Sequence, residues 1–319
     1  MIPPATGDGF VRVDKPVGMT SHDAVAAARR ALGIRRIGHT GTLDPFATGL
    51  LLLGVGRATR LAEYLGAFPK EYLATARLGE VTDTLDPEGE VTARSEAWRT
   101  LAPARIEAAL RALEGEQDQL PPLHSAKKVR GEPAHRRVRR GEEVTLAPAR
   151  ITVHEIELLE LALPHLRFRV LCSTGSYVRA IARDLGEALG VGAHLRELRR
   201  TAIGPHRVEG APAPDRLGDR TTLEGAWITP LEALGHLPRL EISLAEVEAI
   251  EAGRAIAVAP EGEGEGEGEG AREGRGERAP GLPGLAPDAP VALACGERLV
   301  AVARLSAGVA HPKKVFPRD

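Results

Sequence analysis

The chain has 319 residues, of which 43% are hydrophobic and 27% charged, and its formal net charge is −2. This composition is typical of a globular protein with one large domain and a small one. The two cysteines, Cys172 and Cys295, lie too far apart to indicate a disulfide framework or a cysteine-rich zinc site. No apolar run approaches 18 residues, and the first residues lack a signal-peptide pattern. We therefore expect a cytoplasmic protein that is neither secreted nor bound to a membrane.

Hydrophobic patterning predicts a mixed α and β domain in the first part of the chain. One expected helix has Thr20 or Ser21 as its N-cap and Gly33 as its stop signal. The strand around Tyr72 alternates, so that every second side chain faces the core. The helix around Ile181 carries one apolar stripe. In chain order, strands are expected over 9–16, 50–56, 70–79, 149–161 and 166–172, and helices over 20–33, 59–65, 103–113 and 176–190.

The character of the sequence changes after residue 238. A short helix is expected within 242–256, and residues 290–305 read as a hairpin that turns at Gly296. We therefore expect a domain over 1–238 and a small β-rich domain over 239–319. The Glu/Gly-rich stretch 261–286 cannot bury apolar surface, and it is predicted to be a disordered insertion.

The basic residues are unevenly distributed. Residues 261–278 contain seven Glu and three Arg, so this stretch contributes −4 and the rest of the chain +2. Between 127 and 140 there are seven cations against one acid, Glu132. Such a block suits a phosphate backbone, although a solvated loop has the same composition. Gly131 and Pro133 interrupt it, which favours a loop or a broken helix.

One candidate for chemistry stands in the loop "GHTGTLDPFATG", residues 38–49. No phosphate-binding loop, dinucleotide motif or histidine set with metal-ligand spacing is present, so neither a nucleotide cofactor nor a metal is expected. Asp44 is the one carboxylate of this loop, directly before a strongly apolar strand. It is either an ordinary Asp-Pro turn or a nucleophile that a cation such as Arg179 keeps ionised.

The loop also carries a family resemblance. "GHTGTLDPFATGLLLLGVGRATR" (38–60) resembles the catalytic motif of the bacterial tRNA pseudouridine-55 synthases of the TruB type. Four more segments match this family in its order: 13–25, 70–89, 172–205 and 311–317. The resemblance implies the α+β pseudouridine synthase fold, with a central mixed, mainly antiparallel sheet flanked by helices and loops. It further implies a small C-terminal PUA-like RNA-binding domain.

The resemblance also implies residue roles. Asp44 would be the nucleophile in an isomerisation that detaches a uracil from N1 and rejoins it through C5, without a cofactor. The uridine must leave its stack, so base flipping is expected, and the loop glycines would let the backbone approach the flipped nucleotide. His39 would fill the space left by the base, and Tyr72 would stack on the uracil. The other implied residues are the pocket residues Tyr177 and Leu198 and the supporting residues Arg179, Lys15 and Asp86.

Residues 121–141 correspond to the insertion that grips the tRNA T-loop in this family. His124 and His135 stand where tyrosines are usual. The expected partner is the T-arm of tRNA, bound by a monomer that needs no other protein. The residues expected to contact the RNA backbone are Lys127, Lys128, Arg130, Arg136, Arg137, Arg139 and Arg140.

Three alternatives remain at this point. The first is a synthase that works inside guide-RNA particles, although the His-Thr-Gly of the loop and the insertion favour the stand-alone type. The second is a glycoside hydrolase that pairs Asp44 with Asp83 or Asp86. The third is a non-catalytic RNA-binding protein or tRNA chaperone, in which Asp44 is only a turn residue.

Overall fold

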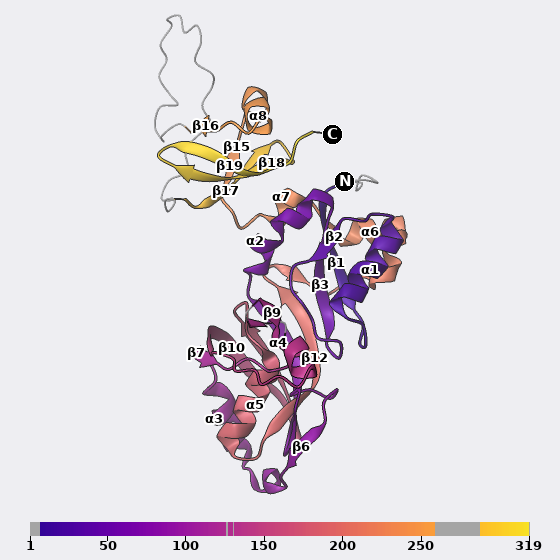
Figure 1. The fold of residues 1–319 in the computed structure, drawn as a ribbon, viewed down its shortest axis with the longest axis vertical. Coiled ribbons are helices and arrows are strands. Elements are labelled where there is room, and N and C mark those ends of the chain that lie inside the picture. Colours follow the sequence, from indigo (N-terminus) through magenta and orange to yellow (C-terminus); the bar gives the residue numbers. More distant parts are fainter. Residues whose placement is uncertain (1–6, 126, 130, 259–287, 319) are drawn as a thin grey trace, which may run out of the picture.

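The computed structural model describes residues 7–125, 127–129, 131–258 and 288–318. Within that part of the chain, a large and a small β-sheet follow one another along the long axis of the molecule (Figure 1). The Glu/Gly-rich stretch 261–286 lies outside the described residues, so its disorder stays a prediction.

The large sheet has ten strands in the order β14-β1-β3-β12-β4-β11-β10-β7, with β2 beside β3 and β13 beside β12. Among the described pairings of this sheet only β12 with β3 is parallel, which confirms the predicted mixed, mainly antiparallel sheet. The strands are β1 (Gly9–Lys15), β2 (Ile37–His39), β3 (Thr48–Val55), β4 (Lys70–Leu78), β7 (Gly115–Gln119), β10 (Ala149–Ala162), β11 (His165–Cys172), β12 (Ala193–Ile203), β13 (His206–Arg207) and β14 (Trp227–Ile228). A separate two-stranded ribbon joins β5 (Glu80–Thr82) to β6 (Val91–Arg94).

Capping residues fix both ends of the first helix. The hydroxyl of Thr20 accepts a hydrogen bond from the amide of Asp23, whose carboxylate accepts one from the amide of Thr20, and Gly33 ends the helix at φ 68°. The predicted first helix is thereby confirmed. The helical segments of this region are α1 (Ser21–Leu32), η1 (Gly56–Leu61), α2 (Ala62–Gly66), η2 (Ala97–Thr100), α3 (Pro103–Arg111), α5 (Val178–Leu189), η3 (Pro214–Gly218), α6 (Arg220–Ala226) and α7 (Pro230–Ala233).

The main core lies between one face of the large sheet and the helices α3 and α5. Alternate residues of β4, from Tyr72 to Leu78, are buried there, as the alternation predicts. The apolar stripe of α5 packs onto them through Val178, Ile181 and Leu185. No helix in the described part of the chain combines the length and apolar composition needed to cross a bilayer.

The small sheet begins at Arg239 and has the order β15-β17-β18-β19-β16. Its elements are β15 (Arg239–Glu241), α8 (Leu244–Glu251), β16 (Ile256–Ala257), β17 (Pro290–Cys295), β18 (Arg298–Ser306) and β19 (Val309–Val315). The predicted hairpin over 290–305 is confirmed as β17 and β18. Phe316 and Val302 share one hydrophobic cluster with Leu61 and Leu65 of η1 and α2, so the two sheets are joined by apolar packing.

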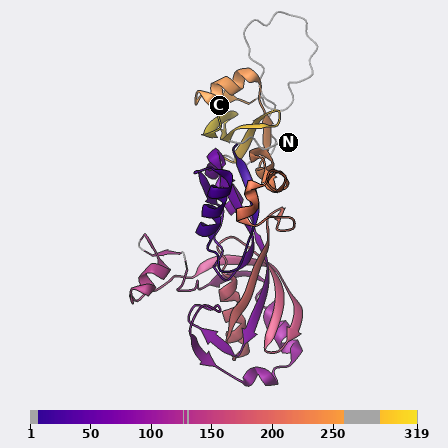
Figure 2. The same ribbon diagram turned by 90° about the vertical axis from the view of Figure 1, so that its right-hand side faces the viewer.

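The insertion stands out from the large sheet, as Figure 2 shows. It contains the short pair β8 (Lys128–Val129) and β9 (Glu132–Pro133), followed by α4 (Ala134–Arg139). A loop or broken helix was expected over this segment, and a single short helix with a small ribbon is found.

The large sheet contains strands that the sequence did not predict, namely β2, β7, β12, β13 and β14. Residues 193–203 form a central strand, β12, which was not predicted because bulges at Leu195/Glu197 and Arg200/Ala202 break its alternation. His39 belongs to β2 and Thr48 begins β3, so the irregular loop covers only residues 40–47.

Candidate active site

Asp44 lies in the loop between β2 and β3, on the wall of a cavity of about 270 Å³. The same cavity is lined by Tyr72 of β4, by Leu198 of β12 and by the turn from Ser173 to Arg179 that leads into α5. Four segments far apart in the sequence therefore meet at one carboxylate. The structure brings Asp44, Tyr72, Tyr177, Arg179 and Leu198 together, as the family resemblance implies.

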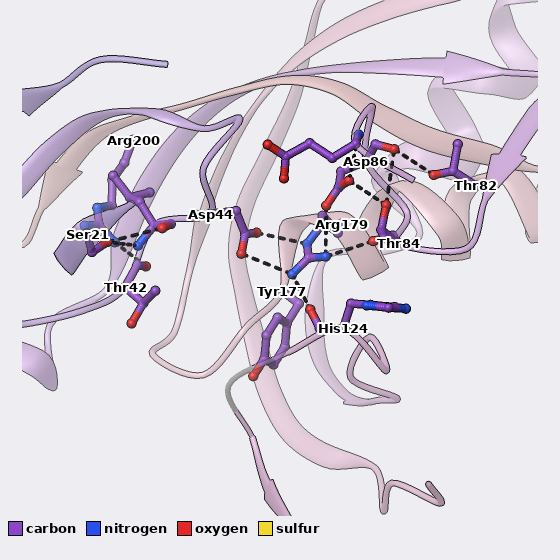
Figure 3. Close-up of polar contacts among 12 residues, drawn as sticks. Ser21, Thr42, Asp44, Thr82, Thr84, Asp86, His124, Tyr177, Arg179 and Arg200 are labelled. Atoms are coloured by element: carbon purple, nitrogen blue, oxygen red, sulfur yellow. Dashed lines mark hydrogen bonds and ion pairs between the residues drawn. The ribbon is translucent and has the colours of Figure 1, made fainter. Parts of the chain in front are cut away.

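An ion pair joins Asp44 to Arg179 (Figure 3). The Nη2 atom of Arg179 donates to Oδ1 of Asp44 at 3.2 Å, and Nε lies 2.9 Å from Oδ2. The Nε contact has an ion-pair distance but a poor angle for a hydrogen bond, so Nη2 is the better donor. The side chain of Arg179 is only 4% exposed, whereas that of Asp44 is 33% exposed. The Asp44 carboxylate thus faces the cavity, and the Arg179 guanidinium lies on its buried side.

Arg179 is itself fixed by three further acceptors. Nη1 donates to the carbonyl of Thr84 at 2.8 Å and to Oδ2 of Asp86 at 3.0 Å. Nη2 donates to the carbonyl of His124 at 2.9 Å. Asp86 is buried and also accepts a hydrogen bond from the hydroxyl of Thr84. The guanidinium therefore has one orientation, which fixes the direction of the Asp44 carboxylate.

Burial raises the pKa of Asp44 above the ordinary value for an aspartate. The nearby charge of Asp86 acts in the same direction, while Arg179 and Lys15 lower this pKa. A desolvated carboxylate with a cation at its back is the arrangement that an oxygen nucleophile requires. The site therefore combines a carboxylate paired with a buried cation and an apolar and aromatic surface formed by Tyr72 and Leu198.

The pocket residues come from different kinds of element. Tyr72 is buried on β4, and burial raises the pKa of its phenol. Tyr177 is the N-cap residue of α5, and Gln119 at the end of β7 holds its backbone: the Tyr177 amide donates to Oε1 at 2.8 Å, and Nε2 donates to its carbonyl at 3.2 Å. Leu198 comes from the central strand of the large sheet, β12.

Lys15 also supports the loop, through a contact with Pro45. Its side chain is buried, and Nζ donates to the carbonyls of Pro16, Met19 and Pro45 at 2.9, 2.6 and 3.3 Å. Burial is the main reason that the pKa of Lys15 falls to about 8, while Asp44 counteracts that shift. Lys15 therefore connects the first strand to the residue that follows Asp44.

His39 lies beside the cavity and does not line it. Its ring contacts the ring of His22 edge-on, with centroids 5.7 Å apart. Nδ1 is buried without a hydrogen-bond partner among the described residues, and burial lowers the pKa of the ring. The imidazole is therefore neutral, and it lies directly before Thr40, the first residue of the loop.

The cations of the insertion are partly neutralised within it. Arg140 pairs with Glu132 and Glu142, both at 2.7 Å, and Arg137 pairs with Glu142 at 2.7 Å. Arg136 is exposed, and the described part of the chain offers it no carboxylate within ion-pair distance. Lys127 donates to the carbonyl of Ala147. The described residues do not include Arg130 or the side chains of Lys128, His135 and Arg139, so the predictions on these four stay untested.

Three site residues were missed by reasoning from the sequence: Lys70, Gln119 and Arg200. Gln119 precedes the insertion and carries no signal that points to α5. Arg200 shares a strand face with Leu198, so alternation would have found it had β12 been predicted. Lys70 is nearly buried, with Nζ bound to the carbonyls of Gly66 and Phe68.

The reason for one loop glycine also differs from the expectation. Gly49 has φ 104°, and a Cβ there would lie 2.2 Å from the carbonyl oxygen of Arg200. The close approach at this position is therefore made by strand β12, and a flipped nucleotide is not what requires the glycine.

Comparison with solved structures defines the class of the fold. The chain aligns over 98% of its length, at a TM-score of 0.70 and 26% identity, with 86% of a chain in the structure of an H/ACA RNP bound to a substrate RNA containing 2′-deoxyuridine. It aligns similarly, at a TM-score of 0.69, with 87% of a chain in the archaeal box H/ACA sRNP Nop10-Cbf5 complex. The fold is that of the pseudouridine synthases.

Comparison of sequences identifies the family. Residues 29–178 match the TruB family pseudouridylate synthase N-terminal domain, and residues 179–219 match the tRNA pseudouridylate synthase B C-terminal domain. The chain is 46% identical over 252 residues to tRNA pseudouridine synthase B of Prochlorococcus marinus (strain MIT 9313), covering 78% of each chain. It is 50% identical over 224 residues to that of Thermobifida fusca (strain YX), covering 68% of this chain and 76% of the relative. The chain therefore belongs to the TruB family of pseudouridylate synthases.

Proposed function

We propose that this enzyme converts uridine 55 in the T-loop of tRNA to pseudouridine, with Asp44 as the nucleophile. The observation that carries the proposal is the Asp44 carboxylate, ion-paired to Arg179 and exposed to a cavity that Tyr72 and Leu198 line. The relatives named tRNA pseudouridine synthase B support tRNA as the substrate. The resemblance of residues 38–60 supports the position in the T-loop.

The reaction follows from the geometry in balanced steps. The target uridine leaves its stack and enters the cavity, where its ring lies against Tyr72 and Leu198. Asp44 attacks an electrophilic carbon of the nucleoside, either C1′ of the ribose or C6 of the uracil. The N1–C1′ bond breaks, the base turns, a C5–C1′ bond forms, and the bond to Asp44 breaks, which returns the free carboxylate. The proton on C5 passes to solvent and N1 gains a proton, so no electrons are transferred and no co-reactant is consumed.

The paired-carboxylate hydrolase is disfavoured by the site. Asp86 is buried and holds Arg179 and Thr84, so it cannot activate a water in the cavity. Asp83 accepts a hydrogen bond from the amide of Glu90 and does not line the cavity. The turn-residue interpretation of Asp44 is disfavoured by the buried guanidinium, because a simple turn needs no cation.

We further propose that the enzyme acts as a monomer in the cytoplasm, without a guide RNA. Its insertion would hold the T-arm, and the sheet over residues 239–318 would act as a PUA-like RNA-binding domain. The exposed Arg136 and the projection of α4 away from the large sheet support a role of the insertion in RNA contact.

The test uses a tRNA transcript with tritium at C5 of its uridines. We expect release of one equivalent of tritium per tRNA by the purified chain alone, and none from a matched transcript in which uridine 55 is replaced by cytidine. Equal release from both transcripts would refute the position. Free uracil and an abasic site would indicate a hydrolase, and activity only after addition of a guide RNA would indicate the particle-dependent type.

A further inference from the structure

Arg200 is a large, fully buried side chain next to the nucleophile loop. It stands on β12 and is 1% exposed. Nε donates to the carbonyl of Leu50 at 2.7 Å, Nη2 to that of Gly41 at 3.2 Å and Nη1 to that of Thr42 at 3.4 Å. The described part of the chain places no carboxylate within ion-pair distance of this guanidinium. The guanidinium thus bonds backbone carbonyls before and after Asp44, and it also donates a hydrogen bond to the phenol of Tyr72.

A buried cation without a counter-ion is costly to the fold. Desolvation of such an ion costs several kcal/mol, and apolar residues of similar volume often do better where only stability matters. A guanidinium, however, carries five donors in a fixed plane. At this position the guanidinium bonds Gly41 and Thr42 at the beginning of the loop and Leu50 in the strand after it, which an apolar side chain cannot do.

The loop depends on such cross-links because its own bonding is sparse. Within residues 40–47 the backbone bonds described are Thr40 to Leu52, Ala47 to Asp44 and Gly18 to Pro45. Side chains supply the remainder: Ser21 exchanges hydrogen bonds with the backbone of Leu43, and Lys15 bonds Pro45. Arg200 supplies the contacts at Gly41, Thr42 and Leu50. In Figure 3, Arg200 and Arg179 approach Asp44 from opposite sides.

The backbone of Arg200 links the same loop to the aromatic side of the cavity. Arg200 pairs with Gly49 of β3 and with Tyr72 of β4. One residue therefore sets the position of the loop relative to the tyrosine on which the uracil would lie. A shift of the loop along β12 would move Asp44 and leave Tyr72 in place.

We propose that Arg200 is a positioning residue for the isomerisation: it holds the loop so that the Asp44 carboxylate meets a ring seated on Tyr72. This inference rests on the proposed function of Asp44. Misplacement of a reacting group by about 1 Å costs on the order of 100-fold in rate. Arg200 borders the cavity but lies outside the insertion that would hold the T-arm, so we expect tRNA affinity to change little when it is replaced.

The test compares Arg200→Lys with Arg199→Lys. Lysine keeps the charge, but a single Nζ cannot reach the carbonyls of both Gly41 and Leu50. Arg199 is the neighbouring residue on the opposite face of β12, where it pairs with Asp14 at 2.7 Å. We expect the single-turnover rate of tritium release to fall about 100-fold in Arg200→Lys while the Kd for tRNA stays within about threefold. For Arg199→Lys, both values should stay within about threefold of the unmodified enzyme.

Amide hydrogen exchange distinguishes a positioning role from a general structural role, because only the first loosens the loop and leaves the rest of the fold unchanged. In Arg200→Lys, we expect faster exchange in peptides covering residues 40–50 and unchanged exchange in α5. Faster exchange throughout the large sheet would overturn the proposal, and so would an unchanged single-turnover rate. If the lysine variant does not fold, Arg200→Gln is measured by the same criteria, since it removes the buried charge. Failure of the unmodified enzyme to release tritium would refute the proposed function instead.

Discussion

Replacement of Asp44 by asparagine tests the nucleophile with little change of shape. The amide is nearly isosteric with the carboxylate, but it has no charge and almost no nucleophilicity. Arg179 loses the charge of Asp44 and one of its two contacts at 3.2 and 2.9 Å, since the amide oxygen can still accept, and it keeps Asp86 at 3.0 Å and the carbonyls of Thr84 and His124 at 2.8 and 2.9 Å. The guanidinium is therefore not left as a buried charge without a counter-ion.

The expected magnitudes for stability and catalysis differ widely. The lost ion pair would destabilise the fold, whereas removal of a desolvated carboxylate, whose pKa is raised by burial, would stabilise it. These effects oppose each other, so the net change should be about 1 kcal/mol or less, or roughly 2–4 °C in Tm. Loss of a covalent nucleophile should lower the single-turnover rate by at least about 10⁴-fold.

The assay measures tritium release, tRNA binding and thermal unfolding on the same preparation. Asp44→Glu serves as the matched control, because it keeps the charge and moves the carboxylate by about an ångström; it should fold and bind but lose on the order of 100-fold in rate. Residual activity of the asparagine variant within tenfold of the unmodified enzyme would refute the nucleophile. A parallel loss of binding and Tm would support the turn-residue interpretation.

Three further predictions concern pH, the insertion and the repeat. Because the pKa of Asp44 is raised, kcat/KM should fall as the pH is lowered through that pKa. Asp86→Asn removes a like charge and should move this fall to lower pH. An unchanged pH profile in this variant would contradict an influence of Asp86 on the pKa of Asp44. Arg136→Ala should reduce the salt slope of tRNA binding by about one unit. Arg140→Ala should reduce this slope less, because Glu132 and Glu142 already neutralise that arginine, and an equal effect of both variants would refute the distinction. An unchanged slope in the fourfold alanine variant at 136, 137, 139 and 140 would exclude the block from the interface. Deletion of residues 261–278 should leave Tm and activity nearly unchanged, since the cost of closing a loop varies slowly with its length; a large loss of either would show that the segment packs or contacts RNA.

The sequence alone determined several local elements and the candidate for the nucleophile. Thr20 and Gly33 fixed both ends of α1 because capping depends on side chains within a few residues of each terminus. The alternation around Tyr72 fixed the buried face of β4. The loop around Asp44 stood out because it is long, ordered and matched by a family motif, and the comparisons place the chain in that family.

Only the tertiary structure decided what surrounds Asp44. Residue periodicity shows which face of an element is buried, but it does not show which element lies beside it. Because bulges break the alternation of β12, neither this central strand nor the buried contacts of Arg200 could be predicted from the sequence. The partners of Arg179 come from segments 55 to 135 residues away in the sequence. Such contacts depend on how the sheet closes around the cavity, which no local pattern encodes.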